Sequence, residues 1–132
     1  MLGSWTLDLP GTQAYAQQQR GALTYLGGTV YVPLGGLYGD CGPYVGRVVA
    51  VHPGRAPVAY RVPTARQGAI WAPAGVSVAA NGDLYAATGN SASNSAWDGG
   101  DSVLRLSPAL KLLGYFTPRT FAYLNRSDLD LG

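Results

Sequence analysis

The chain has 132 residues, a length that suits one domain, and its formal net charge is +2. The arginines are scattered and do not alternate with aromatic residues, so the sequence argues against a nucleic-acid partner. No apolar run approaches the roughly 18 residues that a membrane-spanning helix needs, and the first residues lack the basic and apolar regions of a signal peptide.

Composition favours strands over helices. The chain contains 19 Gly and 9 Pro, all of its 7 acidic residues are Asp, and Lys111 is the one lysine among its 9 basic residues. Glu and Lys are common on exposed helices, so their near absence disfavours helical structure. Short runs rich in Val, Thr and Tyr, bounded by Gly, are typical of strands. We therefore expect an all-β protein.

The N-terminal segment predicts the end of a repeat unit that precedes the first complete one. Apolar and polar residues alternate over residues 4–9, as in a strand with one buried face. Residues 11–20 are polar and form either an ordered loop or a short helical turn, and their periodicity does not decide between the two. We assign residues 1–21 to this preceding unit and its linker.

Residues 22–63 predict a first complete unit of four short strands, which cover residues 22–26, 29–32, 47–51 and 58–62. A Gly-rich insertion, residues 33–46, separates the second strand from the third. It contains Cys41, the one cysteine of the chain, which excludes an internal disulfide and a cysteine-based metal site. We expect a free thiol there.

After a linker of residues 64–74, residues 75–118 predict a second unit, with strands at residues 76–78, 84–86, 102–106 and 112–116. The Asn81-Gly82 pair predicts a tight hairpin, because both residues tolerate a positive φ. Pro118 ends the last strand, since proline lacks the N–H that a sheet needs. The longest insertion, residues 89–100, again falls between the second and third strands.

The two units form an internal repeat. Residues 26–31 lie 54 before residues 80–85, and residues 49–51 lie 55 before residues 104–106; Tyr60 likewise matches Tyr115. A unit that recurs at such a spacing indicates a propeller or array, in which each unit buries its faces against its neighbours. We predict a partial β-propeller with two four-stranded antiparallel blades and flanking strands. The insertions of both blades then map to one face, often the binding face.

Two blades cannot close a ring, because closed propellers have about four to eight. Either the chain is part of a longer protein, or copies of it assemble. We expect its partners to be the remaining blades of a parent chain or further copies of itself, and we assign residues 119–132 to the start of the next unit.

Loop oxygens are the candidates for chemistry, since carboxylate and amide oxygens suit a hard cation such as Ca²⁺. Asp98 and Asp101 also fit simple turn chemistry, and Asp128 and Asp130 would share one face of a strand. His52, the one histidine, precedes a proline and is interpreted as a solvated turn residue; no nucleophile motif is present. The full set of candidate oxygen ligands is Asp40, Asn90, Asp98, Asp101, Asp128 and Asp130.

Much of the chain resembles the pyrroloquinoline-quinone (PQQ)-like β-propellers, which include the quinoprotein alcohol dehydrogenases. The similar stretches run from Gly68 through Trp71 to the Thr88-Gly89-Asn90 element, and over residues 101–108. Residues 19–23 and 30–42 are similar to the bacterial PQQ-like repeat proteins more than to the enzymes. Together these stretches cover nearly the whole chain.

The resemblance implies a calcium-bound quinone centre. Asn90 takes the place of the asparagine that helps to hold the calcium ion, and Trp71 and Asn90 are the candidate cofactor-binding residues. An apolar wedge between two sheets is the other interpretation of Trp71. Asp128 or Asp130 is the nearest counterpart of the catalytic aspartate, without the tryptophan that accompanies it in the enzymes. The glutamate ligand and the adjacent cysteine pair of those enzymes have no counterpart here.

We therefore expect a non-catalytic PQQ-like repeat segment, without PQQ or calcium, that serves as a scaffold or as a ligand- or protein-binding surface of a larger bacterial protein. We further expect the parent protein to be exported to the periplasm or the extracellular space. The alternative is a segment of a PQQ- and calcium-dependent dehydrogenase that oxidises alcohols or sugars, with Asp128 or Asp130 as its catalytic residue.

Overall fold

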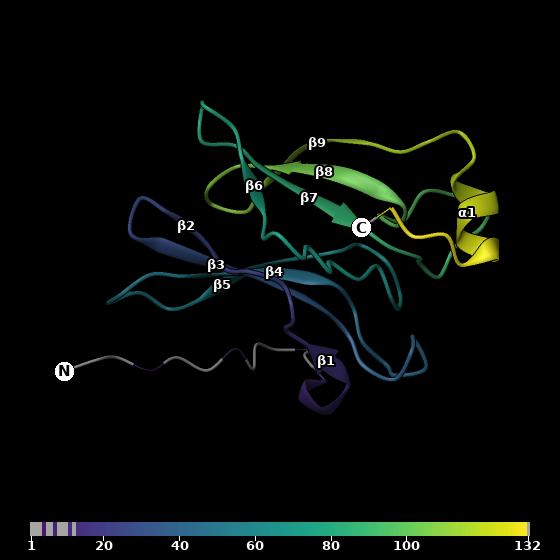
Figure 1. The fold of residues 1–132 in the computed structure, drawn as a ribbon, viewed down its shortest axis with the longest axis horizontal. Coiled ribbons are helices and arrows are strands. Elements are labelled where there is room, and N and C mark those ends of the chain that lie inside the picture. The colour runs from purple at the N-terminus through teal and green to yellow at the C-terminus, as the bar shows by residue number, and fades with distance from the viewer. Residues whose placement is uncertain (1–3, 5–6, 8–10, 12, 132) are drawn as a thin grey trace.

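A computed structural model describes residues 4, 7, 11 and 13–131 of the chain. These residues form two antiparallel sheets with a short 3-10 helix and an α-helix (Figure 1), which confirms the all-β prediction. The elements are η1 (Ala14–Ala16), β1 (Gln17–Gln18), β2 (Thr24–Leu26), β3 (Thr29–Gly36), β4 (Arg47–Val51), β5 (Val58–Arg61), β6 (Ser77–Val78), β7 (Leu84–Thr88), β8 (Ser102–Leu106), β9 (Leu112–Phe116) and α1 (Phe121–Ser127).

The first sheet contains β1 to β5 in the order β1-β3-β4-β5, and β2 also pairs with β3. Both β1 and β2 are antiparallel to β3: β2 pairs with its first residues and β1 with its last two. The turn between β2 and β3 is Gly27-Gly28, with φ of 55° and 82°. Two residues with positive φ match the right-handed twist of the flanking strands, which is why glycine stands at both positions.

The second sheet has the order β6-β7-β8-β9, and its strands lie where the sequence predicts them. Its first hairpin differs from the prediction. Val78 pairs with Leu84, so the loop spans residues 79–83, and within it only Gly82 has a positive φ, of 87°. Asn81 instead accepts a hydrogen bond from the N–H of Asp83 at 3.1 Å. The expected positive φ at Asn81 is therefore wrong, because its side chain closes the turn locally.

A β-bulge displaces the last strand of the second sheet. The register shifts between Arg105 and Leu106, so that Phe116 pairs with Val103. In the first sheet Tyr60 occupies this position, because it pairs with Val48, the counterpart of Val103. The structural match of Tyr60 is thus Phe116, and the match with Tyr115 is wrong by the one residue that the bulge adds.

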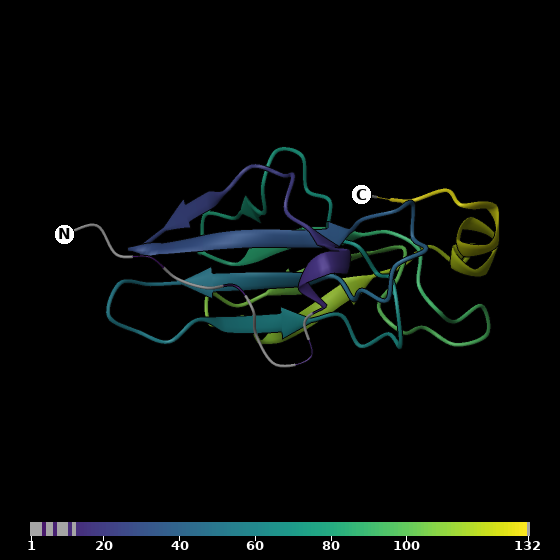
Figure 2. The ribbon, with the colours of Figure 1, turned by 90° about the horizontal axis from the view of Figure 1, so that it is seen from below.

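The two sheets pack face to face as two layers (Figure 1), and the strands of the second lie behind those of the first in the perpendicular view (Figure 2). Fully burying a leucine contributes about 1.5–3 kcal/mol, so Leu84, Leu104 and Leu106, each 0% exposed, are major contributors to this layer. The core between the sheets consists of Tyr31, Val48, Ala50, Val62, Ile70, Val76, Leu84, Ala86, Leu104, Leu106 and Leu110.

Equivalent faces of the two sheets do not meet each other. We call the face of the first sheet that carries Tyr31 and Val48 its front face, and the face that carries Val32 and Val49 its back face. By the repeat register, Tyr31 and Val48 correspond to Tyr85 and Val103, and Val32 and Val49 correspond to Ala86 and Leu104. The front face of the first sheet packs on Ala86 and Leu104, which form the back face of the second. The sheets are therefore stacked front to back.

Front-to-back stacking leaves one front face uncovered. Tyr31 and Val48 are 1% and 0% exposed, whereas their counterparts Tyr85 and Val103 are both 37% exposed, and Phe116 beside Val103 is 66% exposed. A symmetric sandwich would bury equivalent residues on both sheets, so this difference marks an open stack rather than a closed pair.

The flanking segments complete the description. On the back face of the first sheet, Leu7 packs against a cluster that includes Val32 and Val49; the rest of the predicted strand at residues 4–9 lies largely outside the described residues. Residues 11–20 contain both η1 and β1, so the helical-turn interpretation is partly confirmed. Residues 119–131 contain α1, an element that the sequence does not predict.

Candidate functional site

The insertions of both sheets lie at the same end of the molecule, where the linker between the sheets joins them. The N–H of Gln67 donates to the carbonyl of Tyr44 in the first insertion, at 2.8 Å. The next N–H, of Gly68, donates to the carbonyl of Asn90 in the second insertion, at 2.5 Å. This end is therefore a polar junction of three backbone segments, and it carries most of the candidate residues.

Asn90 is the centre of this polar junction. Its side chain is buried; its backbone N–H donates to Oδ1 of Asp130 at 2.7 Å, and its Nδ2 donates to Oδ1 of Asp128. Its Oδ1 is buried without a hydrogen-bond partner among the described residues. A Cβ on the preceding Gly89 would lie 2.5 Å from Oδ1 of Asp130, so glycine allows the C-terminal segment to approach. The structure thus brings Asn90, Asp128 and Asp130 together.

Helix α1 is held over this junction by the carboxamide of Asn125. Its Oδ1 accepts from the N–H of Ser91 at 2.5 Å, and its Nδ2 donates to the carbonyls of Ser91 at 2.9 Å and Ser93 at 3.2 Å. One side chain therefore satisfies both polar groups of the Ser91 backbone, as a neighbouring strand would. Asp128 follows in the left-handed region, with φ of 54°, and turns the chain toward Asn90.

Asp101 is a carboxyl group that is buried at the polar junction. Its side chain is 1% exposed, and both of its carboxyl oxygens lack a hydrogen bond to any described residue. Burial raises the pKa of Asp101 to about 6, and the negative charges of Asp130 and Asp98 act in the same direction. The folded chain therefore holds a proton on Asp101 up to a higher pH than an exposed aspartate would.

The other acidic candidates serve turns and side-chain pairs. Asp98 Oδ2 accepts from the hydroxyl of Thr64 at 2.8 Å and from the N–H of Ser93 at 3.1 Å, which is turn chemistry. Asp40 accepts from the hydroxyl of Tyr44, and burial together with this contact raises the pKa of Tyr44. Cys41 is an exposed free thiol, as expected.

Trp71 contacts residues of the first sheet and its insertion. Its ring packs with Tyr44, at 6.4 Å between centroids, and against Gly35, where a Cβ would lie 2.4 Å from the ring. The guanidinium carbon of Arg20 sits 4.1 Å above the ring centroid, a cation–π contact. Trp71 therefore belongs to a small cluster with Ala16, Tyr44 and Ala69 rather than to the main core between the sheets.

The residues present do not fit the calcium and quinone centre that the resemblance implies. Asn90 and Asp101 do offer buried oxygens that no described residue hydrogen-bonds. However, the sequence contains no Glu for the second ligand. Within the described part of the chain no three acidic, histidine or cysteine side chains converge as metal ligands. A hard cation prefers six to eight oxygens, so the set is too small.

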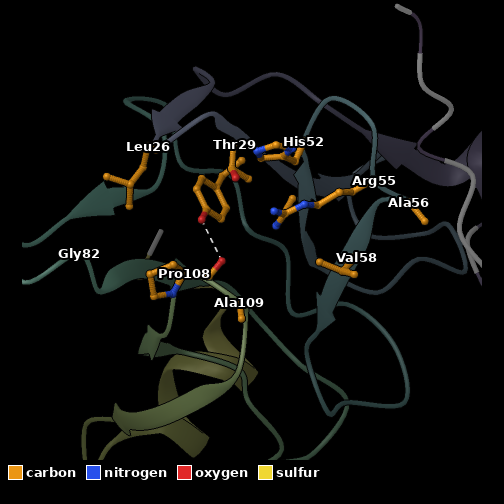
Figure 3. Close-up of a pocket in the computed structure, with 12 residues that line it drawn as sticks. Leu26, Thr29, His52, Arg55, Ala56, Val58, Gly82, Pro108 and Ala109 are labelled. Atoms are coloured by element: carbon orange, nitrogen blue, oxygen red, sulfur yellow. Dashed lines mark hydrogen bonds between the residues drawn. The ribbon is translucent and has the colours of Figure 1, made fainter.

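A pocket occupies the opposite end of the molecule, between the hairpin tips of the two sheets (Figure 3). Its volume is about 670 Å³, and its walls come from the β2–β3 and β4–β5 hairpins of the first sheet and from the β6–β7 and β8–β9 turns of the second. The polar groups at its rim include His52 and Arg55. This site was not predicted from the sequence, because the His52 turn was interpreted as solvated; the available indication was a histidine and an arginine in one short hairpin.

No family model, no curated protein and no solved structure matches the chain. None of the helices in the described part of the chain is long and apolar enough to cross a membrane.

Proposed function

We propose that this chain is a non-catalytic repeat segment of a β-propeller of the PQQ-like kind, and that it serves as a scaffold and binding surface in a larger bacterial protein. The observation that carries the proposal is the front-to-back stacking of two sheets related by an internal repeat. Each unit of a propeller presents one face to the unit before it and the other face to the unit after it. The exposed face of Tyr85, Val103 and Phe116 is then the surface that the next unit covers.

The chemistry of the exposed front face supports this proposal. Tyr85 and Phe116 are large and apolar, and Val103 lies opposite Phe116 on the same face. Arg105 crosses the face and pairs with Asp83 at 2.5 Å, so its charge is neutralised within the sheet. Its pKa is raised and that of Asp83 lowered, chiefly by their hydrogen bond. Apart from this ion pair, the front face of the second sheet is similar to the front face of the first sheet, which is buried.

The proposal is tested by adding a third unit. A second copy of residues 64–118 is inserted between Pro118 and Arg119, so that its back face can cover Val103. Val103→Cys, in a chain with Cys41→Ser, reports the exposure of the face through its rate of thiol labelling. We expect rapid labelling in the present chain and labelling at least tenfold slower in the extended chain.

The control is Tyr25→Cys on β2, a position that is 73% exposed and lies on the first sheet. It should label at the same rate in both chains. Equal labelling of Val103→Cys in both chains would show that the inserted copy does not dock, and the repeat-segment proposal would then be withdrawn.

A second candidate function, a segment of a quinoprotein dehydrogenase, is favoured only by the partnerless oxygens of Asn90 and Asp101. Its test is the absorbance spectrum and dye reduction with alcohols or sugars after addition of PQQ and Ca²⁺. Tight PQQ binding with turnover, both lost in Asn90→Ala, would establish this candidate in place of the scaffold.

A further inference from the structure

We propose that the pocket between the hairpin tips binds a small carboxylic acid with an apolar body, and that Arg55 holds the carboxylate. Its volume, about 670 Å³, lies within the roughly 300–1,000 Å³ that is usual for small-molecule sites. This inference does not depend on the propeller proposal, because the pocket lies between the two sheets of this chain alone.

The walls of the pocket are mainly apolar. Leu26, Ala50 and Val58 line it from the first sheet, and Pro108 and Ala109 close it from the second. Burial of such surfaces against the aliphatic or aromatic part of a ligand is favourable, because water is excluded from both. The walls therefore select for a ligand with an apolar body.

The floor of the pocket is fixed by a buried tyrosine. Tyr31 is 1% exposed, and its hydroxyl donates to the carbonyl oxygen of Pro108 at 2.8 Å (Figure 3). This bond joins the first sheet to the β8–β9 turn of the second. Because the two walls are tied together at the floor, the cavity is already formed before a ligand arrives, which lowers the entropic cost of binding.

The charged group of the pocket is Arg55. Its side chain is exposed and reaches toward the space between His52 and Pro108 (Figure 3). None of the described residues that line the pocket is acidic, and the ion pair found among the described residues belongs to Arg105 and Asp83 instead. The guanidinium of Arg55 is therefore available to a ligand. Its planar pair of N–H groups matches the two oxygens of a carboxylate.

The ring of His52 is held in one orientation at the pocket. Its Nδ1 lies 2.7 Å from the carbonyl oxygen of Pro53, and a carbonyl can only accept, so Nδ1 carries the proton. The ring is thereby held beside Gly28, where a Cβ would lie 3.2 Å from Nε2. With a single guanidinium at the rim, the pocket suits a singly charged carboxylate better than a doubly charged phosphate.

The test uses octanoate as the probe and octanamide, its uncharged analogue of the same length, as the comparison. Titrations of the full chain are followed by amide NMR and by calorimetry. We expect octanoate to shift the amide signals of Gly27 and Gly82, which line the pocket, and not that of Gly114 on β9. Octanamide should bind at least tenfold more weakly.

Three variants separate the charge from the cavity. Arg55→Gln should weaken octanoate binding at least tenfold and leave octanamide binding unchanged, whereas Arg119→Gln, which removes the same charge from an exposed position outside the pocket, should change neither. Ala109→Trp fills the pocket mouth and should abolish binding of both probes. Equal binding of octanoate to the Arg55→Gln variant, or no shift at Gly27 and Gly82, would overturn the proposal.

Discussion

The hydroxyl of Tyr31 donates to the carbonyl of Pro108, 77 residues along the chain and in the other sheet, at 2.8 Å. The donor stands on the front face of the first sheet, and the acceptor lies in the turn that follows β8. Tyr85, the repeat counterpart of Tyr31, has no sheet in front of it and is 37% exposed. The same position of the repeat is thus buried and hydrogen-bonded in the first unit and partly exposed in the second.

Tyr31→Phe removes this hydroxyl and keeps the ring. A hydrogen bond of this kind contributes about 1 kcal/mol net, and the carbonyl of Pro108 is left without its donor. We expect the free energy of unfolding, measured by urea denaturation, to fall by about 1–2 kcal/mol. Tyr25→Phe, at a position 73% exposed, should change it by less than about 0.5 kcal/mol. Equal effects of the two variants would contradict a structural role for the bond.

Asp101→Asn should change how stability depends on pH. Burial raises the folded-state pKa of Asp101 from its ordinary value of 3.8 to about 6, so the folded state binds the proton more tightly than the unfolded state. The stabilising contribution of protonated Asp101 is therefore complete below about pH 4 and is lost as the pH rises through about 6. We expect the free energy of unfolding of the Asp101→Asn variant to equal that of the unsubstituted protein at pH 4. At pH 8 the variant should be more stable by about 2–3 kcal/mol, since one pKa unit corresponds to about 1.4 kcal/mol.

The same variant provides the control for a cation. If Ca²⁺ held the oxygens of Asp101 and Asn90, millimolar Ca²⁺ would raise the melting temperature at pH 8, and both Asp101→Asn and Asn90→Ala would abolish that rise. We expect no rise in any of the three proteins, and only a modest loss of stability in Asn90→Ala. Micromolar Ca²⁺ binding by calorimetry that disappears in Asn90→Ala would refute this prediction.

Asn125→Ala should release helix α1 from the polar junction. The carboxamide of Asn125 holds the backbone of Ser91 and Ser93, whereas no residue of the helix itself is buried. An isolated helix of seven residues is unstable in water, so its order depends on these contacts. Hydrogen exchange should accelerate over residues 121–127 and at Ser91 and leave β8 unchanged. Arg126→Gln, one residue along and exposed, should leave all of these rates unchanged.

Helix α1 could not be predicted from the sequence, whereas the strands could. The strands follow from local chemistry, because short apolar runs and turn residues set their positions, and the register of β3 with β4 matches that of β7 with β8 at the repeat offsets. Helix α1 has no such local cause, since Asn125 acts on a loop more than 30 residues away. The bulge that puts Phe116 at the position equivalent to Tyr60 likewise cannot be detected by matching Tyr60 with Tyr115 in the sequence.

The candidate site was predicted only in part, because its residues also come from segments far apart in the sequence. Asn90, Asp128 and Asp130 do come together, but through a left-handed residue after a helix rather than on one strand. The pocket needed the structure, because Arg55 and Pro108 lie on different sheets and meet only when the hairpin tips are packed together.

The last prediction concerns two glycines of opposite surroundings. A Cβ on Gly46 would lie 1.7 Å from the carbonyl oxygen of Gly68, whereas a Cβ on Gly114 in β9 would meet nothing within 4 Å. Gly46→Ala forces apart two backbone segments at the polar junction, where the N–H of Gly46 also donates to Gln67 at 2.9 Å. We expect a loss of about 3 kcal/mol, because overpacking against backbone cannot relax by a rotamer change. Gly114→Ala should be neutral or stabilise by up to about 1 kcal/mol, since it removes freedom from the unfolded chain only. The measurement is the free energy of unfolding of both variants by urea denaturation. Similar values would show that the linker and the sheet pack less closely at the polar junction than this contact requires.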